Sequence, residues 1–149
     1  MCDSLKGRVR YFTTRYRKSH DGRGRACVLV DDQEIINMPF IVEYNLYTEV
    51  RKRKESESDK HYAELYKEVS NEYYNQGLYQ PGDFGFALDE FLSNSISESL
   101  ESDDWIVRML AIMDRRVGKR TLEKIKPSIG NLPEWLQYFY NLRLQGENV

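Results

Sequence analysis

Few residues of this chain have the types and spacing that catalysis or metal binding requires. The two histidines, His20 in a glycine-rich turn and His61 beside a charged segment, have no second ligand at a motif spacing. The sequence contains no His-Glu-x-x-His, Cys-x-x-Cys, phosphate-binding loop or Gly-x-Ser-x-Gly pattern. We therefore expect no metal and no cofactor and assign no catalytic residue, although an enzyme whose site forms only in three dimensions stays open.

Paired carboxylates are the nearest approach to acid–base chemistry, which needs two carboxyl groups across a cleft. They occur at Asp89/Glu90 and at Asp103/Asp104. Neighbouring side chains on a helix point in different directions, so neither pair has the required arrangement. Asp103 and Asp104 follow Ser102, a good N-cap, and carboxylates in a first turn complement the helix dipole. Helix capping is therefore the favoured interpretation.

Basic and aromatic residues alternate along the first predicted strand, which suits phosphate binding and base stacking. The competing interpretation is that the rings pack within the hairpin while the long basic side chains extend to water. The whole chain has 22 bases and 24 acids, a net charge of −2, which is not typical of a dedicated nucleic-acid binder. The candidate residues on this strand are Arg8, Arg10, Phe12, Tyr16 and Lys18.

A second basic segment, Asp-Arg-Arg-Val-Gly-Lys-Arg at 114–120, follows an apolar run. We expect a helix to end at Gly118, where cations complement the exposed carbonyl groups. An ion pair with Asp114 or with an acid on another helix is a further interpretation, and a bidentate site for an anionic ligand is the third. The candidate anion-binding residues here are Arg115, Arg116, Lys119 and Arg120.

The charges are strongly segregated along the chain. Residues 1–28 carry eight bases and two acids, residues 83–104 carry seven acids and no base, and residues 115–126 carry six bases and one acid. These blocks either meet inside one fold or face separate partners, and both alternatives stay open. Eleven tyrosines accompany them, and tyrosine and arginine are typical anchors of protein interfaces.

These observations lead us to expect a small protein-binding or regulatory module without catalysis. Weak binding of RNA or single-stranded DNA through the basic and aromatic strand is the alternative. No apolar run approaches the length of a membrane span, and residues 1–7 do not resemble a signal peptide. We expect a cytoplasmic protein in which Cys2 and Cys27 are reduced.

Periodicity predicts strands in the first part of the chain and helices after it. Residues 8–16, 26–30 and 34–38 have strand composition, with turns at 19–25 and 31–33. Residues 41–50 fit either a strand or a helix, and residues 51–60, without any apolar side chain, predict a flexible charged linker. Helical spacing marks the rest: 62–76 up to Gly77, 84–96, 105–113, a short helix at 121–125 ending before Pro127, and a last helix after Pro133.

The predicted class is therefore α+β, with an antiparallel meander of three or four strands followed by four or five packed helices. We expect a single domain over 1–149, with 1–50 mainly strands, 51–60 the linker and 61–149 mainly helical.

Several segments together resemble a family of uncharacterised bacterial proteins. They are Ser-Leu-Lys-Gly-Arg-Val at 4–9, Ile-x-Asn-Met at 35–38, Ser-Ile-x-Glu-Ser-Leu-Glu-Ser at 95–102, Asp-Arg-Arg-Val-Gly-Lys-Arg at 114–120 and Tyr-Phe-Tyr-Asn-Leu-Arg at 138–143. The resemblance implies a bacterial cytosolic origin and an additional helix before the opening motif in relatives. It carries no activity, ligand or site residue, and Gln33 stands where the family has a glycine.

Overall fold

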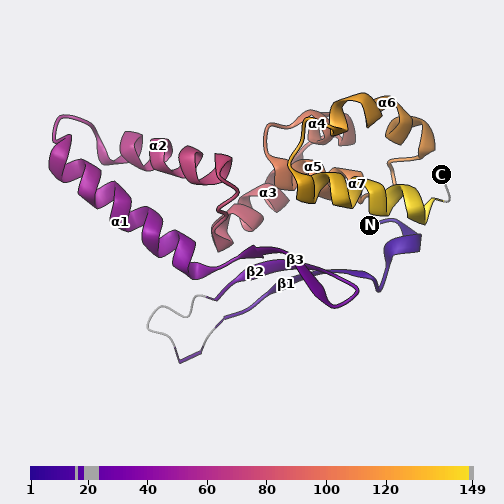
Figure 1. Ribbon diagram of the computed structural model, residues 1–149, viewed down its shortest axis with the longest axis horizontal. Coiled ribbons are helices and arrows are strands. Elements are labelled where there is room, and N and C mark those ends of the chain that lie inside the picture. Colours follow the sequence, from indigo (N-terminus) through magenta and orange to yellow (C-terminus); the bar gives the residue numbers. More distant parts are fainter. Residues whose placement is uncertain (16, 19–23, 148–149) are drawn as a thin grey trace. The chain divides into compact units, whose positions relative to one another are not determined.

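The computed structural model describes residues 1–15, 17–18 and 24–147 (Figure 1). In these residues a three-stranded antiparallel sheet, in the order β1-β2-β3, precedes seven α-helices. The predicted α+β class is confirmed, and so are three of the predicted strands. Tyr16, His20 and most of the turn predicted at 19–25 lie outside the described residues. The strands are β1 (Val9–Thr13), β2 (Ala26–Val30) and β3 (Gln33–Met38).

The helices outnumber the four or five that periodicity predicts, because residues 40–56 are helical and the segment 84–96 is divided in two. A short 3-10 helix near the N-terminus, η1, spans Asp3–Leu5. The α-helices are α1 (Phe40–Ser56), α2 (Tyr62–Asn75), α3 (Pro81–Ser93), α4 (Ile96–Glu101), α5 (Trp105–Ile112), α6 (Lys119–Ile129) and α7 (Glu134–Gly146).

The chain divides into two compact units, which we describe separately. Unit 1 consists of Met1–Arg10, Val28–Ile36 and Phe84–Val149, and unit 2 consists of Tyr11–Cys27 and Asn37–Asp83. Unit 1 therefore contains η1, α3 from Phe84 onward and the helices α4 to α7, whereas unit 2 contains the α1–α2 pair.

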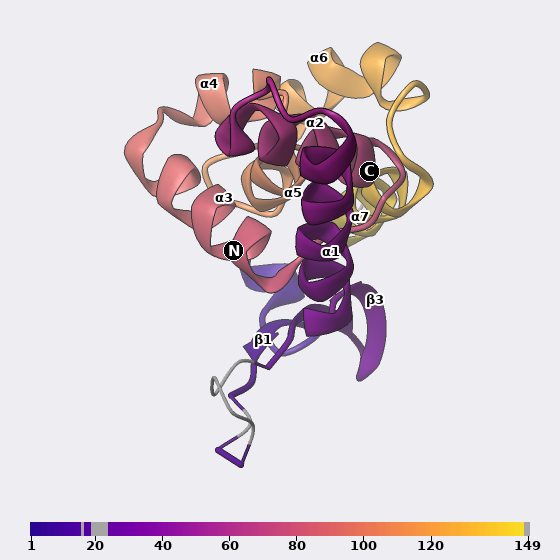
Figure 2. The ribbon, with the colours of Figure 1, turned by 90° about the vertical axis from the view of Figure 1, so that its left-hand side faces the viewer.

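Unit 2 is built on the α1–α2 hairpin, whose two helices run side by side (Figures 1 and 2). Its core consists of Leu46 and Val50 from α1 and Leu65 and Val69 from α2. The strand alternative for 41–50 is therefore wrong. The buried positions 42, 46 and 50 are four residues apart, which places them on one side of a helix. This burial outweighs the strand-like alternation that the β-branched residues suggested.

The charged linker predicted at 51–60 is also corrected, since residues 51–56 continue α1. Arg53 explains why this apolar-free segment is ordered as a helix. Its Nε donates to Glu49 one turn earlier at 3.1 Å, and its two Nη atoms donate to Glu72 of α2 at 2.9 and 2.7 Å. The ion pairs thus fix the end of α1 against α2 without any apolar side chain.

The end of α2 follows the prediction. Gly77 has a φ of 75°, and the N–H groups of Gly77 and Leu78 donate to the carbonyl oxygens of Tyr74 and Tyr73. These two bonds form a Schellman motif, which favours glycine because other residues are strained at positive φ. The sequence therefore ends the helix at the expected residue.

In unit 1, side-chain caps separate three consecutive helices. Ser95 and Glu98 form a capping box at the start of α4, so the apolar pattern predicted as one helix over 84–96 is interrupted. The N-cap of α5 is Asp104, whose carboxylate accepts from Ile106 and Val107 N–H. The predicted cap, Ser102, instead accepts from Asp104 N–H and donates to Glu90.

Helix α6 is longer than the predicted segment 121–125, and Pro127 lies inside its last turns rather than after its end. Leu122 is fully buried and Ile129 is 7% exposed, so apolar contacts hold the chain on both sides of the proline. Burial of these two side chains outweighs the hydrogen bond that the proline nitrogen is unable to donate.

The Arg53–Glu72 pair should make the hairpin sensitive to acid. Hydrogen bonds from Arg53 lower the pKa of Glu72. The pair therefore stabilises the fold fully above the ordinary glutamate pKa of about 4.3, and this contribution is lost as the pH falls through the lower pKa of the folded state. We expect Glu72→Gln to reduce the free energy of unfolding in urea at pH 7 and to have no effect at strongly acidic pH.

Glu55→Gln serves as the control, because Glu55 is exposed on α1 and forms no ion pair with a described residue. It should leave the urea midpoint unchanged at both pH values. An equal loss of stability for Glu72→Gln at neutral and acidic pH would contradict the ion-pair explanation.

Candidate functional site

Arg8, which precedes β1, and Arg10 within it both pair with the turn between β2 and β3. Asp31 and Asp32 have φ values of 48° and 67°, so both central residues of this two-residue turn are left-handed, as a type I′ hairpin requires. Arg8 donates to both carboxylate oxygens of Asp31 at 3.0 and 2.7 Å, and Arg10 donates to Asp32. The hydrogen bond between the first pair raises the pKa of Arg8 and lowers that of Asp31. The predicted second turn is confirmed.

The other candidates from the first strand lie in unit 2. Phe12 is 44% exposed and Lys18 is exposed. The strands approach closely there, because a Cβ at Gly24 would lie 1.9 Å from the carbonyl oxygen of Thr14. The four described candidates are thus divided between the units, Arg8 and Arg10 in unit 1 and Phe12 and Lys18 in unit 2, and Tyr16 lies outside the described residues.

The segment 114–120 connects two helices instead of ending one. Helix α5 ends before Met113, and Gly118 is the N-cap of α6 with extended backbone angles, so the predicted helix end at Gly118 is wrong. Lys119 and Arg120 therefore lie in the first turn of α6, at the positive end of its dipole. This position does not stabilise cations, so capping does not explain these two bases.

Arg116 is the base of this segment that pairs internally. It donates to Asp114 from its backbone N–H and its Nε, both at 2.8 Å, and its guanidinium lies 5.7 Å from the ring centre of Phe91. Partial burial raises the pKa of Asp114, but the hydrogen bonds and charge of Arg116 together lower it. The predicted pairing within the segment is confirmed for this arginine.

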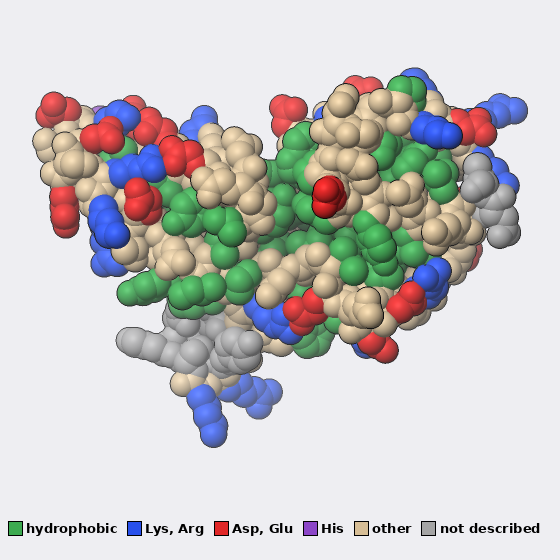
Figure 3. All heavy atoms as spheres, in the orientation of Figure 1, with side chains coloured by type: hydrophobic (Ala, Val, Ile, Leu, Met, Phe, Trp, Pro, Cys, Tyr) green, Lys and Arg blue, Asp and Glu red, His purple; other side chains and the backbone are tan. Residues whose placement is uncertain are grey.

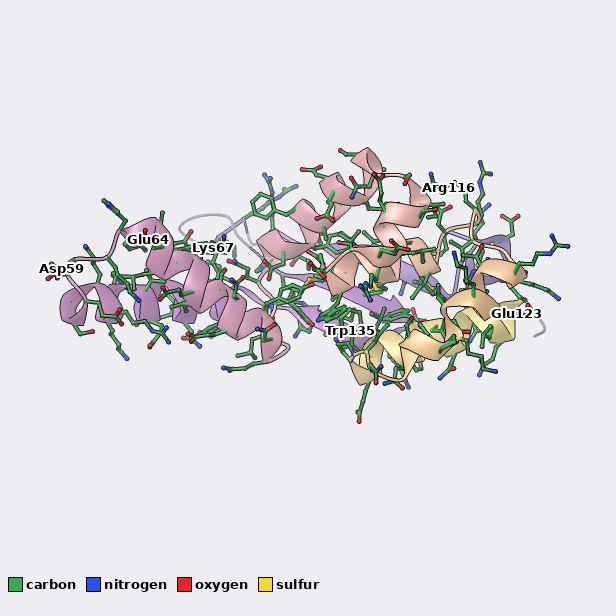
Figure 4. All side chains as sticks on the ribbon, turned by 90° about the horizontal axis from the view of Figure 1, so that it is seen from above. Asp59, Glu64, Lys67, Arg116, Glu123 and Trp135 are labelled. Atoms are coloured by element: carbon green, nitrogen blue, oxygen red, sulfur yellow. The ribbon has the colours of Figure 1, made fainter. Side chains whose placement is uncertain are left out.

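The remaining candidates in the segment are free of ion pairs among the described residues. Arg115, Lys119 and Arg120 are exposed, and none of them has a carboxylate within ion-pair distance. Figure 4 shows Arg116 on the connection and Glu123 on α6. The structure therefore leaves a cluster of unpaired cations at the start of α6.

A buried arginine on α7, which sequence reasoning missed, positions this connection. The Arg143 side chain is 1% exposed, its Nη2 donates to the carbonyl oxygen of Val117 at 2.7 Å, and its Nη1 pairs with Glu147. One turn earlier, the hydroxyl of Tyr140 donates to the carbonyl oxygen of Leu122 at 2.8 Å. Two side chains of α7 thus fix Val117, which precedes the N-cap of α6, and Leu122 in the first turns of α6.

The position of Arg143 in the apolar pattern of α7 is the sequence signal that marks it as a buried residue. Leu136, Phe139 and Tyr140 form the buried side of α7, and Arg143 continues it at seven, four and three residues beyond them. A charged residue at an interior position is expected to have buried polar partners, because an unpaired buried charge is very costly. The sequence pattern therefore pointed to a partner, although it did not identify the carbonyl group of Val117.

The outward side of α1 is the main apolar feature of unit 2. Ile41 is 56% exposed and Tyr44 is 54% exposed, and Thr48 and Arg51 continue the same side at helical spacing. Figure 3 shows charged side chains gathered at the far end of the hairpin and hydrophobic side chains gathered nearer the start of α1. This side therefore changes from apolar to basic along the helix.

Among the described residues, no group of three or more His, Cys, Asp or Glu side chains is arranged to hold a metal ion. None of the described helices combines the length and apolarity needed to cross a membrane. Cys2 and Cys27 are free and buried.

Replacing Arg143 tests its structural role. We expect Arg143→Met to lower the free energy of unfolding by about 3 kcal/mol, because it leaves the carbonyl group of Val117 and the Glu147 carboxylate without their donor. Glu147→Gln is the control, since it keeps an acceptor at a partly exposed position and should cost less than about 1 kcal/mol. Urea unfolding followed by tryptophan fluorescence measures both, and an unchanged midpoint for Arg143→Met would contradict this role.

Comparison with protein families gives one match, to the model of the SF0329 protein family, over residues 1–144. Comparison with curated proteins and with solved structures gives no match. The family model covers every described strand and helix through residue 144, so it ends two residues before the end of α7. The chain is therefore a member of the SF0329 protein family.

Proposed function

We propose that this protein is a protein-binding or regulatory module without catalysis, and that the outward side of α1 is its contact surface. The observation that carries the proposal is the exposure of two large apolar side chains, Ile41 and Tyr44, three residues apart on one side of a helix. A tyrosine and a branched aliphatic side chain exposed together are typical of interface anchors, because their burial contributes most of the binding free energy.

The charges beside these anchors define the chemistry of the partner. Beyond Tyr44 the same side carries Thr48 and Arg51, and the guanidinium of Arg51 donates to the Thr48 hydroxyl at 3.5 Å. Lys52 is exposed next to them. A complementary partner is an amphipathic protein segment whose apolar side chains are followed by carboxylates, so that both parts of the α1 side are matched.

The alternative is weak binding of RNA or single-stranded DNA, and the exposed ring of Phe12 together with Lys18 favours it. Arg8 and Arg10 favour it less, because a phosphate would have to displace the Asp31 and Asp32 carboxylates. Salt separates the alternatives: phosphate binding weakens steeply and linearly in log salt, whereas an apolar interface weakens little.

Our proposal places the protein in the bacterial cytoplasm. The resemblance of the sequence motifs to a family of bacterial proteins supports this setting, as does the presence of two free, buried thiols. Fractionation of cells that carry a tagged copy would test it.

Site-specific crosslinking from Tyr44 tests the proposed surface. A photoreactive amino acid at residue 44 should give one crosslinked protein in the native cell, and Ile41→Asp in the same chain should reduce the yield at least tenfold. The crosslinked segment, identified by mass spectrometry, should be amphipathic and acidic.

Tyr62 provides the matched control, because it is a tyrosine of similar exposure, 43%, on the other helix of the hairpin. The photoreactive residue at 62 should not capture the same protein. Equal capture from both positions, or crosslinks to RNA that disappear with salt, would overturn the proposed surface.

A further inference from the structure

The outward side of α3 in unit 1 is an unpartnered apolar surface with an acid at its centre. Phe86 is 76% exposed and Leu92 is 70% exposed, the two highest values among the large hydrophobic side chains described as exposed. Asp89 lies midway between them in the sequence, and spacing by three places all of them along one side of the helix. Both apolar side chains would be stabilised by a partner that covers them.

Further exposed acids lie in the same unit, on a segment that the Ser102–Glu90 hydrogen bond joins to α3. They lie on α4 and in the residues that follow it, and none forms an ion pair with a described base. Together with Asp89 they form what we call the acidic surface: Asp89, Glu98, Glu101 and Asp103.

The outward side of α6 carries the opposite charge. Its inner side is formed by Leu122 and Ile129, whereas its exposed side chains include four bases and one acid, Glu123. None of the bases has an ion-pair partner among the described residues. We call this the basic surface: Lys119, Arg120, Lys124 and Lys126.

The two surfaces do not neutralise each other within unit 1. Helix α4 packs on α5, α5 packs on α7 and α7 packs on α6, and no acid of the acidic surface lies within ion-pair distance of a base of the basic surface among the described residues. The charge blocks of the sequence thus remain separate after folding. Their complementarity is available to another molecule, because unpaired exposed charges attract an oppositely charged surface.

We propose that the outward side of α3 with its acidic surface binds the basic surface of α6 in a second copy of this chain. The aliphatic stems of the lysines and of Arg120 would cover Phe86 and Leu92, while their charged ends reach Asp89 and the α4 acids. A polyanion would pair only with the basic surface of α6, and the acidic surface of the same unit would repel it. A second copy supplies a partner for both surfaces.

This contact is heterologous, since each molecule uses a different surface. It therefore leaves one acidic and one basic surface free after each addition, and assembly proceeds to a ring or to an open chain. It is independent of the α1 surface of the proposed function, because it involves only residues of unit 1.

Sedimentation velocity of the full chain tests the proposal. At about 25 mM salt the mean mass should rise with protein concentration above the monomer mass of 17.7 kDa, and at about 500 mM salt it should return to that value. Lys124→Glu and Asp89→Lys should each raise the dissociation constant at least tenfold, because a like charge replaces an attraction. Phe86→Ser should also weaken assembly, but without changing its salt dependence.

Reversing the charges of one surface in each of two chains gives the most specific test of the contact. A chain with Arg120→Glu and Lys124→Glu should be monomeric alone, and a chain with Asp89→Lys and Glu101→Lys should also be monomeric alone. Mixing the two should restore association, because one now carries two acidic surfaces and the other two basic ones. Lys67→Glu, an exposed base on α2 in unit 2, is the control and should leave the wild-type assembly unchanged (Figure 4).

Three results would overturn the proposal. The first is a wild-type monomer at low salt and about 200 μM protein, and the second is an assembly that the charge-exchanged variants neither abolish nor restore. The third is a low-salt monomer that binds poly(U) through Lys124, which would assign the basic surface to a polyanion.

Discussion

The arrangement of unit 1 depends on the buried guanidinium of Arg143. A charge at 1% exposure is stable only with polar partners, and these are the Val117 carbonyl group and Glu147. By holding Val117, Arg143 fixes the connection between α5 and α6. The carbonyl oxygen of Met113, the first residue of this connection, accepts a hydrogen bond from the N–H of Cys2 at 2.9 Å. The N-terminus and Arg143 therefore both hold the connection between α5 and α6, at its two ends.

These contacts explain why cations occupy the first turn of α6 despite the helix dipole. The buried contacts of Arg143 and Tyr140 determine where α6 begins, and Lys119 and Arg120 are consequently carried to exposed positions. Packing thus decides the position of the bases, and their mutual repulsion is a smaller cost at exposed sites. The electrostatic character of this surface is a consequence of the interior.

Local patterns predicted the elements whose signals agree with one another. The strands at 26–30 and 34–38, the helix ended by Gly77 and the helix starting at Trp105 all combine composition with a clear stop or start. The linker prediction for 51–60 failed, and 41–50 stayed open between strand and helix. The period of α1 is masked by β-branched and charged residues, and its partners, Leu65, Val69 and Glu72, lie in another helix. A local sequence pattern does not reveal contacts between two helices.

In the candidate site, too, the sequence predicted local contacts but not contacts between distant residues. The pairing of Arg116 with Asp114 is local and was expected, whereas the pairing of Arg8 and Arg10 depends on a turn 22 to 23 residues away. The interior position of Arg143 was readable from the α7 pattern, but its backbone partner was not. Exposure of Ile41 and Tyr44 became visible only once α1 was known to be a helix.

The two ion pairs at the β2–β3 turn have a further consequence for the sheet. In the order β1-β2-β3, β1 is an edge strand, and Tyr11, Phe12 and Thr13 are exposed along it. Exposed aromatic edges invite strand addition and aggregation. A strand that added beside Arg8 and Arg10 would have to remove water from two charged pairs, so these arginines protect the chain from edge-to-edge polymerisation.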